Sequence, residues 1–268
     1  MESELPEAWI FSIGNELLIG RTVNTNASWL GRRLTAMGFS VRRIVVVPDA
    51  VEEIADEVRR ALGRGRLIVT TGGLGPTYDD VTLAAIARAL GRDMEVNSEA
   101  LAMLKEHYDR RGLPLTEHRI KMAVMPRGAK ALKNSVGSAP GCLLREGSAV
   151  IVSLPGVPKE MEAMFEEVVP YIQGMAPRRE TAECVSRIRG VPESTLAPLM
   201  ERLAKEHVSS YLKSHPLGFE QGMPVLDMRV LSFGKDRQEA EREAREVLAQ
   251  VLKEVEAKGG YHSDIHCD

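Results

Sequence analysis

The sequence predicts an α/β protein with a mostly parallel sheet, followed by a second, smaller α+β domain. Over the first 172 residues, short apolar runs alternate with amphipathic segments of ten or more residues, a pattern typical of right-handed βαβ units. Beyond Pro177 the order changes to strand, helix, strand, strand, helix. We therefore expect a catalytic domain over residues 1–172 and a small domain over residues 178–260, separated by a Gly/Pro segment at 173–178.

The first part of the chain shows this alternation clearly. Apolar runs predict strands, and apolar residues at helical spacing predict helices. The expected strands cover residues 9–13, 41–47, 67–70 and 149–154, and the expected helices cover 26–37, 51–62, 81–90, 98–111 and 159–171. Gly38 and Gly91 stand where two of these helices are expected to end. A further run at 121–126 completes this part.

The second part is read in the same way. The expected strands cover residues 182–189, 208–214 and 225–233, and the expected helices cover 193–207 and 237–258. The final helix interleaves Glu and Arg with apolar positions, which is typical of a salt-bridged helix that covers a sheet. Residues 261–268 include His, Asp and Cys, but so short a terminal segment is expected to be a disordered end.

The composition excludes several classes of protein. Hydrophobic residues make up 44% and charged residues 27%, a balance typical of globular rather than disordered chains. The net charge of −3 argues against a general nucleic-acid binder. No apolar stretch reaches the length of a membrane span and no secretory signal is visible, so we expect a soluble, cytoplasmic protein. Cys142, Cys184 and Cys267 lie far apart, so neither a disulfide framework nor a zinc ribbon is expected.

The most informative segment is the Gly-rich stretch at residues 70–82. A glycine turn between a strand and a helix lets backbone N–H groups converge on an anion, and this turn contains Thr71, Gly72, Gly73 and Gly75. It matches neither the Walker A loop nor the dinucleotide fingerprint. Asp79 and Asp80 would repel a phosphate unless a divalent cation, most simply Mg²⁺, bridged them. The simpler alternative is a glycine turn whose Asp caps the following helix.

Other polar residues also follow predicted strands. Ligands of doubly wound sheets bind outside the carboxyl ends of the strands, so Asp49 is expected to face the same crevice as Asp80. Glu16, Asn24 and Asn26 follow the first strand, and short amides suit ribose or base-edge recognition. Helix capping at Asp49 and turn chemistry at the amides remain the alternatives.

The loop at residues 154–159 enters a helix through two prolines and a lysine. Lys159 is placed to offset phosphate charge, whereas a rigid structural turn explains the prolines equally well.

Taken together, five segments resemble a known family. They are residues 14–18, 24–26, 70–82, 134–141 and 154–161. In this order they resemble the N-terminal domain of the competence/damage-inducible CinA family, within the MoaB/Mog molybdopterin-binding superfamily, over about residues 7–172. Residues 180–258 are similar to the small KH-like second domain of CinA proteins. The nicotinamide-nucleotide amidase domain of that family is lacking, so deamidase activity is not expected.

The resemblance implies a three-layer α/β/α domain with its ligand at the Gly-rich loop. In molybdopterin adenylyltransferases, an acid after a strand and an acid after the glycine loop act near metal and phosphates, and Asp49 and Asp80 match these positions. For CinA-type domains it implies a metal-dependent pyrophosphatase acting on ADP-ribose-like nucleotides, and a related domain of FAD synthases hydrolyses FAD. Leu74 and the pair Tyr78-Asp79 stand where adenylyltransferases carry Thr and Arg, which favours the CinA-type interpretation.

The leading hypothesis is therefore an enzyme, a nucleotide pyrophosphatase, with Asp49 and Asp80 as metal or water-positioning groups and Asp79 as a further metal ligand. Molybdopterin binding with adenylyl transfer is the alternative, and a non-catalytic nucleotide- or pterin-binding module is the third. The expected partner is a small nucleotide rather than a nucleic acid, because residues 218–222 lack the spacing of the G-x-x-G clamp of RNA-binding KH modules. No membrane partner is expected, and CinA-like relatives imply a homodimer.

Overall fold

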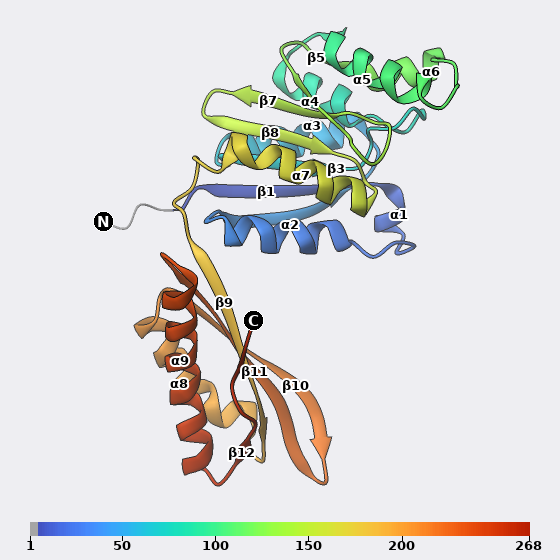
Figure 1. Cartoon of the computed structure of the whole chain (residues 1–268). Helices are drawn as coiled ribbons and strands as arrows, with labels where there is room; N and C mark the ends of the chain where they lie inside the picture. Colours follow the sequence, from blue (N-terminus) through green and yellow to red (C-terminus); the bar gives the residue numbers. More distant parts are fainter. Residues whose placement is uncertain (1–4) are drawn as a thin grey trace. The chain divides into compact units, whose positions relative to one another are not determined.

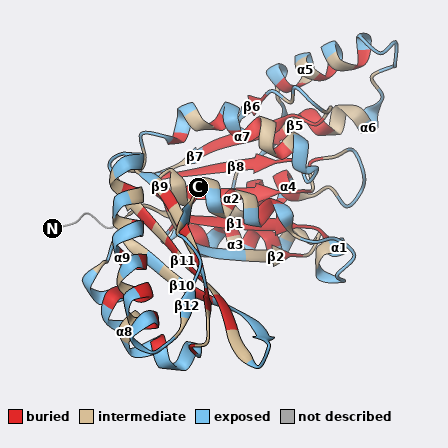
Figure 2. Ribbon diagram, turned by 60° about the horizontal axis from the view of Figure 1, so that its bottom comes forward, coloured by how far each residue is buried: buried red, intermediate tan, exposed pale blue. Residues whose placement is uncertain are grey.

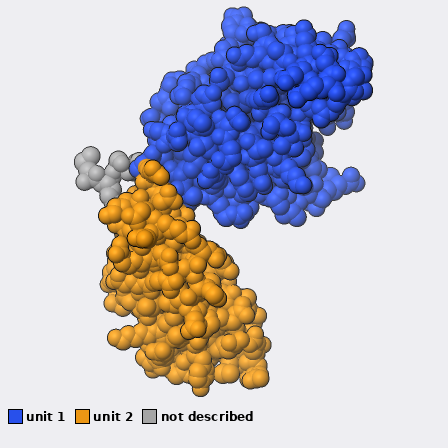
Figure 3. All heavy atoms as spheres, in the orientation of Figure 1, with its two compact units in different colours: residues 1–177 blue, residues 178–268 orange. Residues whose placement is uncertain are grey.

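The computed structural model describes residues 5–268, which divide into two compact units. The first unit ends at Pro177 and the second begins at Arg178 (Figure 3). Each unit has its own hydrophobic core.

The first unit is built on a mixed sheet with the strand order β2-β1-β3-β8-β7-β6 (Figure 1). Its strands are β1 (Glu7–Ile13), β2 (Ser40–Val47), β3 (Leu67–Thr71), β6 (Lys130–Leu132), β7 (Gly141–Glu146) and β8 (Ala149–Leu154). The neighbours β2, β1, β3 and β8 run parallel, whereas β7 is antiparallel to both β8 and β6. The predicted α/β class with a mostly parallel sheet is confirmed.

Helices cover both faces of this sheet. One face packs against α2 (Thr25–Ala36) and α7 (Pro158–Ile172), and the other packs against α3 (Val51–Leu62), α4 (Thr82–Leu90) and α5 (Ser98–Asp109). Because side chains alternate along a strand, the neighbours Ile10 and Phe11 belong to opposite clusters, both fully buried. The central strands are accordingly buried along their length (Figure 2).

Short elements complete the first unit. They are α1 (Asn15–Leu18), β4 (Met94–Val96), α6 (Glu117–Ile120), the 3₁₀ helix η1 (Lys121–Ala123) and β5 (Val124–Pro126). The strands β6 and β7 were absent from the sequence prediction. Their apolar runs are very short, and the strands are stabilised by pairing, β7 with β8 and β6 with β7, rather than by local periodicity.

The second unit is an antiparallel sheet with helices packed on it. Its main elements are β9 (Glu180–Arg189), α8 (Glu193–Glu206), β10 (Ser210–Glu220), β11 (Met223–Gly234) and α9 (Arg237–Ala257). The strand order is β10-β11-β9, and Ile188, Met228 and Val247 belong to one core with residues of both helices. The predicted order of strands and helices is thus found. Within residues 5–268, no helix combines the length and apolarity needed to cross a membrane.

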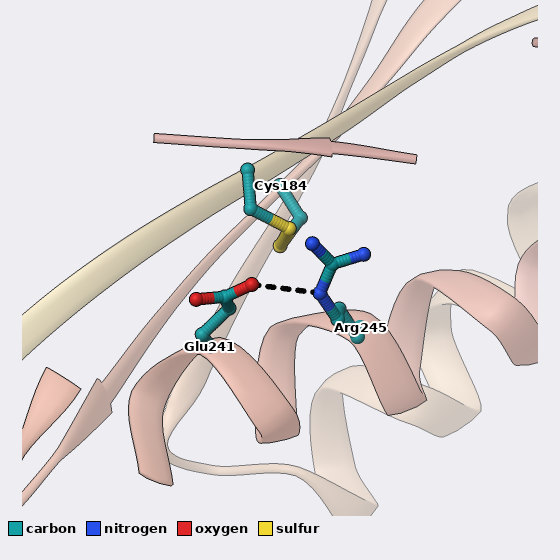
Figure 4. Close-up of a disulfide and its surroundings, with 4 residues drawn as sticks. Cys184, Glu241 and Arg245 are labelled. Carbon is teal, nitrogen blue, oxygen red and sulfur yellow. Dashed lines mark hydrogen bonds and ion pairs between the residues drawn. A yellow bond between two sulfur atoms is a disulfide. The ribbon is translucent and has the colours of Figure 1, made fainter. Parts of the chain in front are cut away.

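Two expectations about the C-terminal segment are wrong. The segment is ordered, because β12 (Tyr261–His262) and β13 (His266–Cys267) pair with β9. Pairing places Cys267 opposite Cys184, and the two form a disulfide beside the ion pair of Glu241 and Arg245 on α9 (Figure 4). The cysteines are separated by 83 residues. Their proximity arises from the tertiary fold, and no local spacing pattern reveals it.

Candidate functional site

A cavity of about 380 Å³ lies where the carboxyl ends of the parallel strands meet. After β1 the chain passes through α2 to β2, and α3 then leads it back past β1 to β3. The strand order therefore reverses between β1 and β3, which is the position where doubly wound sheets bind ligands. The cavity is lined by residues that follow β1, β2, β3 and β8, together with the loop before β7 and the start of α7.

The Gly-rich loop after β3 is locked by its own contacts. The Thr82 hydroxyl donates to the carbonyl oxygen of Gly72 over 2.8 Å, and the Thr82 N–H donates to the carbonyl oxygen of Gly73 over 3.3 Å. Gly72 and Gly73 have φ values of 98° and 66°, a region that favours glycine. A Cβ at Gly73 would overlap the Thr82 side chain, and one at Gly72 would overlap the carbonyl oxygen of Ile13. These glycines are thus required by the loop itself.

The two acids of this loop fold back onto it. Asp80 Oδ2 accepts hydrogen bonds from the Thr77 N–H over 2.8 Å and from the Thr77 hydroxyl over 2.5 Å. The same hydroxyl contacts Asp79, and this hydrogen bond is the main reason why the pKa of Asp79 lies below its usual value. The N-cap residue of α4 is Val81, without a side-chain cap hydrogen bond. The alternative in which an Asp side chain caps this helix is therefore wrong.

Asp49 ties the ends of β1 and β2 together. Its Oδ2 accepts from the Asn15 N–H over 2.8 Å, and the carboxylate lines the cavity. The N-cap residue of α3 is Ala50, with no side-chain cap hydrogen bond, so Asp49 does not act as the helix cap. Asp49, Asp79 and Asp80 therefore line one cavity, as does Glu16 from α1.

Several predicted binding residues lie beside this cavity rather than in it. Asn24 caps α2, because its Oδ1 accepts from the Ala27 N–H over 3.1 Å. Asn24, Asn26 and Thr71 line a small cavity of about 70 Å³, which shares Glu16 with the main one. Asn26 donates to the carbonyl oxygen of Gly156 over 2.8 Å.

Lys159 lines neither of these cavities, and its neighbour Glu160 lines the main one. Asn134 donates to Glu160 Oε2 over 2.7 Å, and a Cβ at Gly137 would overlap this carboxylate. Sequence reasoning missed Glu160. The segments 134–141 and 154–161, which contain Asn134 and Glu160, both belong to the resemblance found in the sequence. Whether Lys159 or Glu160 faces the cavity depends on the rotational phase of α7, which the sequence pattern did not settle.

The charge of the main cavity is strongly negative. Among the described residues, its lining contains the carboxylates of Glu16, Asp49, Asp79, Asp80 and Glu160 and no Lys, Arg or His. Within residues 5–268, no three His, Cys, Asp or Glu side chains form a ready-made metal cage. This donor set fits Mg²⁺, which is commonly held by one or two carboxylates together with phosphate oxygens.

Comparison with known proteins indicates the family to which the first unit belongs. A family model described as a probable molybdopterin binding domain matches residues 9–174. A protein of Aeropyrum pernix is 52% identical over 262 residues, covering 97% of this chain and 98% of that protein. A protein of Pyrobaculum calidifontis is 46% identical over 255 residues, covering 95% and 97%.

Among solved structures, the protein CinA from Thermoplasma acidophilum, described as having unknown function, is 44% identical. It matches with a TM-score of 0.59 and covers 62% of this chain and 98% of that one. The resemblance seen in the sequence is thereby confirmed for the first unit. With more than half of its length matched by the family model, the chain belongs to the family described as a probable molybdopterin binding domain.

Proposed function

We propose that the chain is a nucleotide pyrophosphatase, which hydrolyses the pyrophosphate bond of an ADP-ribose-like or FAD-like nucleotide with the help of a divalent cation. The observation that carries this proposal is the charge of the main cavity. Its lining is acidic, yet it borders a Gly-rich loop at the N-terminus of α4, where anions are favoured. A phosphate can occupy such a cavity only when a cation compensates the carboxylates.

In this proposal Asp49 and Asp80 hold the cation. Each uses Oδ2 to fix a neighbouring loop, through the N–H groups of Asn15 and Thr77 respectively, so the carboxylates are held in place before any ligand arrives. A bound divalent cation supplies neutralisation of phosphate charge and lowers the pKa of a coordinated water. Asp79 provides a further oxygen ligand, and the hydrogen bond from the Thr77 side chain that lowers its pKa favours the ionised form.

The remaining groups orient the substrate. The glycine loop turns backbone N–H groups toward the phosphates, which favours charge that develops on their oxygens. Glu160, held by Asn134, lies on the wall formed by α7 and is positioned to accept a proton from the attacking water. The side cavity at Asn26 lies beside the main one and suits the ribose or base edge of the nucleotide.

The test is an incubation of purified protein with ADP-ribose or FAD, with and without Mg²⁺, followed by chromatography of the products. We expect Mg²⁺-dependent release of AMP. Asp80→Asn keeps an oxygen for the Thr77 N–H but removes the charge, so we expect turnover to fall at least about a hundredfold. Asp56→Asn, on the exposed surface of α3, is the matched control and should leave turnover unchanged. No AMP from either nucleotide would contradict the proposal.

Molybdopterin adenylyl transfer is a second candidate, favoured by the family match over residues 9–174. It predicts an adenylylated product when the protein is incubated with ATP, Mg²⁺ and molybdopterin. The Gly-rich loop favours hydrolysis instead, because it carries Leu74 and Tyr78 where the resemblance implies Thr and Arg in adenylyltransferases. In the structure Leu74 is buried and Tyr78 is 93% exposed. Binding without any product would indicate a non-catalytic module.

A further inference from the structure

A second cavity, of about 450 Å³, has the opposite charge to the main one. It lies between the C-terminal end of α5 and the loop that follows β6, and its lining consists of His107, Arg110, Arg111, Lys133, Asn134, Ser135 and Val136. We call it the basic cavity. Arg110, Arg111 and Lys133 carry positive charges, and the lining contains no acidic side chain among the described residues.

Only part of this positive charge is compensated. Glu106 contacts Arg110 at 3.4 Å and Lys133 at 3.9 Å, and all of these side chains are about half exposed or more. Arg111 donates through Nη1 to the carbonyl oxygen of His107 over 3.2 Å. It has no carboxylate partner among residues 5–268, which leaves most of its guanidinium available to a ligand.

The basic and main cavities share a wall. Asn134 lines the basic cavity, and its Nδ2 donates to Glu160 Oε2 and to the carbonyl oxygen of Ala139, both of which line the main cavity. Its Oδ1 accepts from the N–H groups of Val136 and Gly137, so the loop between the cavities is fixed. Charged residues of both cavities also affect the pKa of His107. Burial, Arg111 and Arg110 lower its pKa, and Glu160 opposes them.

We propose that the basic cavity is a binding subsite for a phosphate group that presents three terminal oxygens. Arg111 and Arg110 offer the planar donors that suit phosphate oxygens, and Lys133 adds a point charge. A phosphate can bind here without a metal ion, in contrast to the main cavity. The group is either free orthophosphate or a further phosphate on the nucleotide in the main cavity, and this second source rests on the proposed function.

The first test follows the His107 imidazole by NMR while orthophosphate is added to metal-free protein. Phosphate beside the arginines should raise the pKa of His107, whereas His207, which is bonded to Glu243 in the second unit, serves as the internal reference. Arg111→Gln and Lys133→Gln should each weaken the phosphate response at least about tenfold. Lys105→Gln removes one charge from the exposed face of α5 outside the cavity and should change nothing.

The second test identifies the source of the phosphate. Calorimetry compares ADP-ribose with ADP-ribose 2′-phosphate in the presence of Mg²⁺. Preference for the phosphorylated nucleotide, lost in Arg111→Gln, assigns the group to the same ligand, whereas equal affinities together with the NMR response assign the subsite to free phosphate. The proposal is overturned if the pKa of His107 does not respond to phosphate, or if it responds in Arg111→Gln and Lys133→Gln as strongly as in the unaltered protein. Failure to hydrolyse any nucleotide leaves the NMR result unaffected, so the two proposals fail separately.

Discussion

The lock of the Gly-rich loop can be tested by replacing Thr82 with Val. The side chain of Thr82 is fully buried, and its hydroxyl donates to the carbonyl oxygen of Gly72 over 2.8 Å. Valine keeps the shape but cannot donate, so the buried oxygen loses a partner. Such a loss costs about 1–3 kcal/mol of unfolding free energy. For a unit of this size, the melting temperature should fall by about 2–4 °C per kcal/mol.

Thr70 provides a matched control in the preceding strand. It is also fully buried, but its hydroxyl has no hydrogen-bond partner among the described residues. Thr70→Val therefore removes a desolvated polar atom without breaking a contact, and we expect the unit to be unchanged or slightly stabilised. The same substitution at the same depth is thus expected to have opposite consequences at the two positions.

The assay can be restricted to the first unit. Trp9 and Trp29 are the two tryptophans of the sequence and both lie in this unit, so tryptophan fluorescence reports its unfolding without a signal from the second. This matters because two compact units need not unfold in one transition. Equal melting of Thr82→Val and Thr70→Val would refute the reasoning, because it would mean that the hydroxyl of Thr82 does not hold the loop.

Three further predictions concern other parts of the chain. Gly75→Ala should lower Mg²⁺-dependent turnover with little change in tryptophan melting, because its Cβ would lie 2.6 Å from the Asp80 carboxylate; unchanged turnover would contradict the assigned position of that acid. Cys267→Ser should destabilise the second unit, and chain entropy over the closed loop sets a ceiling of about 4–5 kcal/mol; circular dichroism melts with and without reductant test this. The pKa of His262 is raised, chiefly by a hydrogen bond to the Ser263 carbonyl and also by Glu256, so its contribution to stability should be present below the unfolded pKa of about 6.5 and lost as the pH rises through the folded pKa. NMR titration should show a lower pKa in Glu256→Gln.

The sequence was informative wherever local pattern and structure coincide. The helix at Val51–Leu62 and the strand at Ala149–Leu154 have the bounds that their sequence patterns predict. By contrast, β7 depends on pairing with β8 and β6 on pairing with β7, and the disulfide depends on the C-terminal strand β13 pairing with β9. These features are set by contacts between distant residues, which periodicity does not record.

The glycines of the loop illustrate the same limit at the site. Their presence predicted a turn whose backbone N–H groups converge on an anion. The structure assigns this glycine a φ of 66° and places Thr82 against it, so its first requirement is structural. Gly73→Ala would therefore perturb the fold of the loop and the binding of any ligand together, whereas Gly75→Ala acts through Asp80.

The acids of the main cavity follow from topology more than from any single motif. Asp49 and Asp80 are far apart in sequence, but each follows a strand of one parallel sheet, and parallel strands end at the same edge. This is why their convergence could be predicted without a structure. Glu160 reaches the same edge from α7. If this helix were rotated by one residue, the ammonium group of Lys159 would face the cavity in place of the Glu160 carboxylate. With lysine in that position the lining would carry one positive charge beside four carboxylates, whereas with glutamate it carries five carboxylates and no Lys, Arg or His among the described residues. The phase of α7 therefore sets part of the charge on which the proposed role of a cation rests.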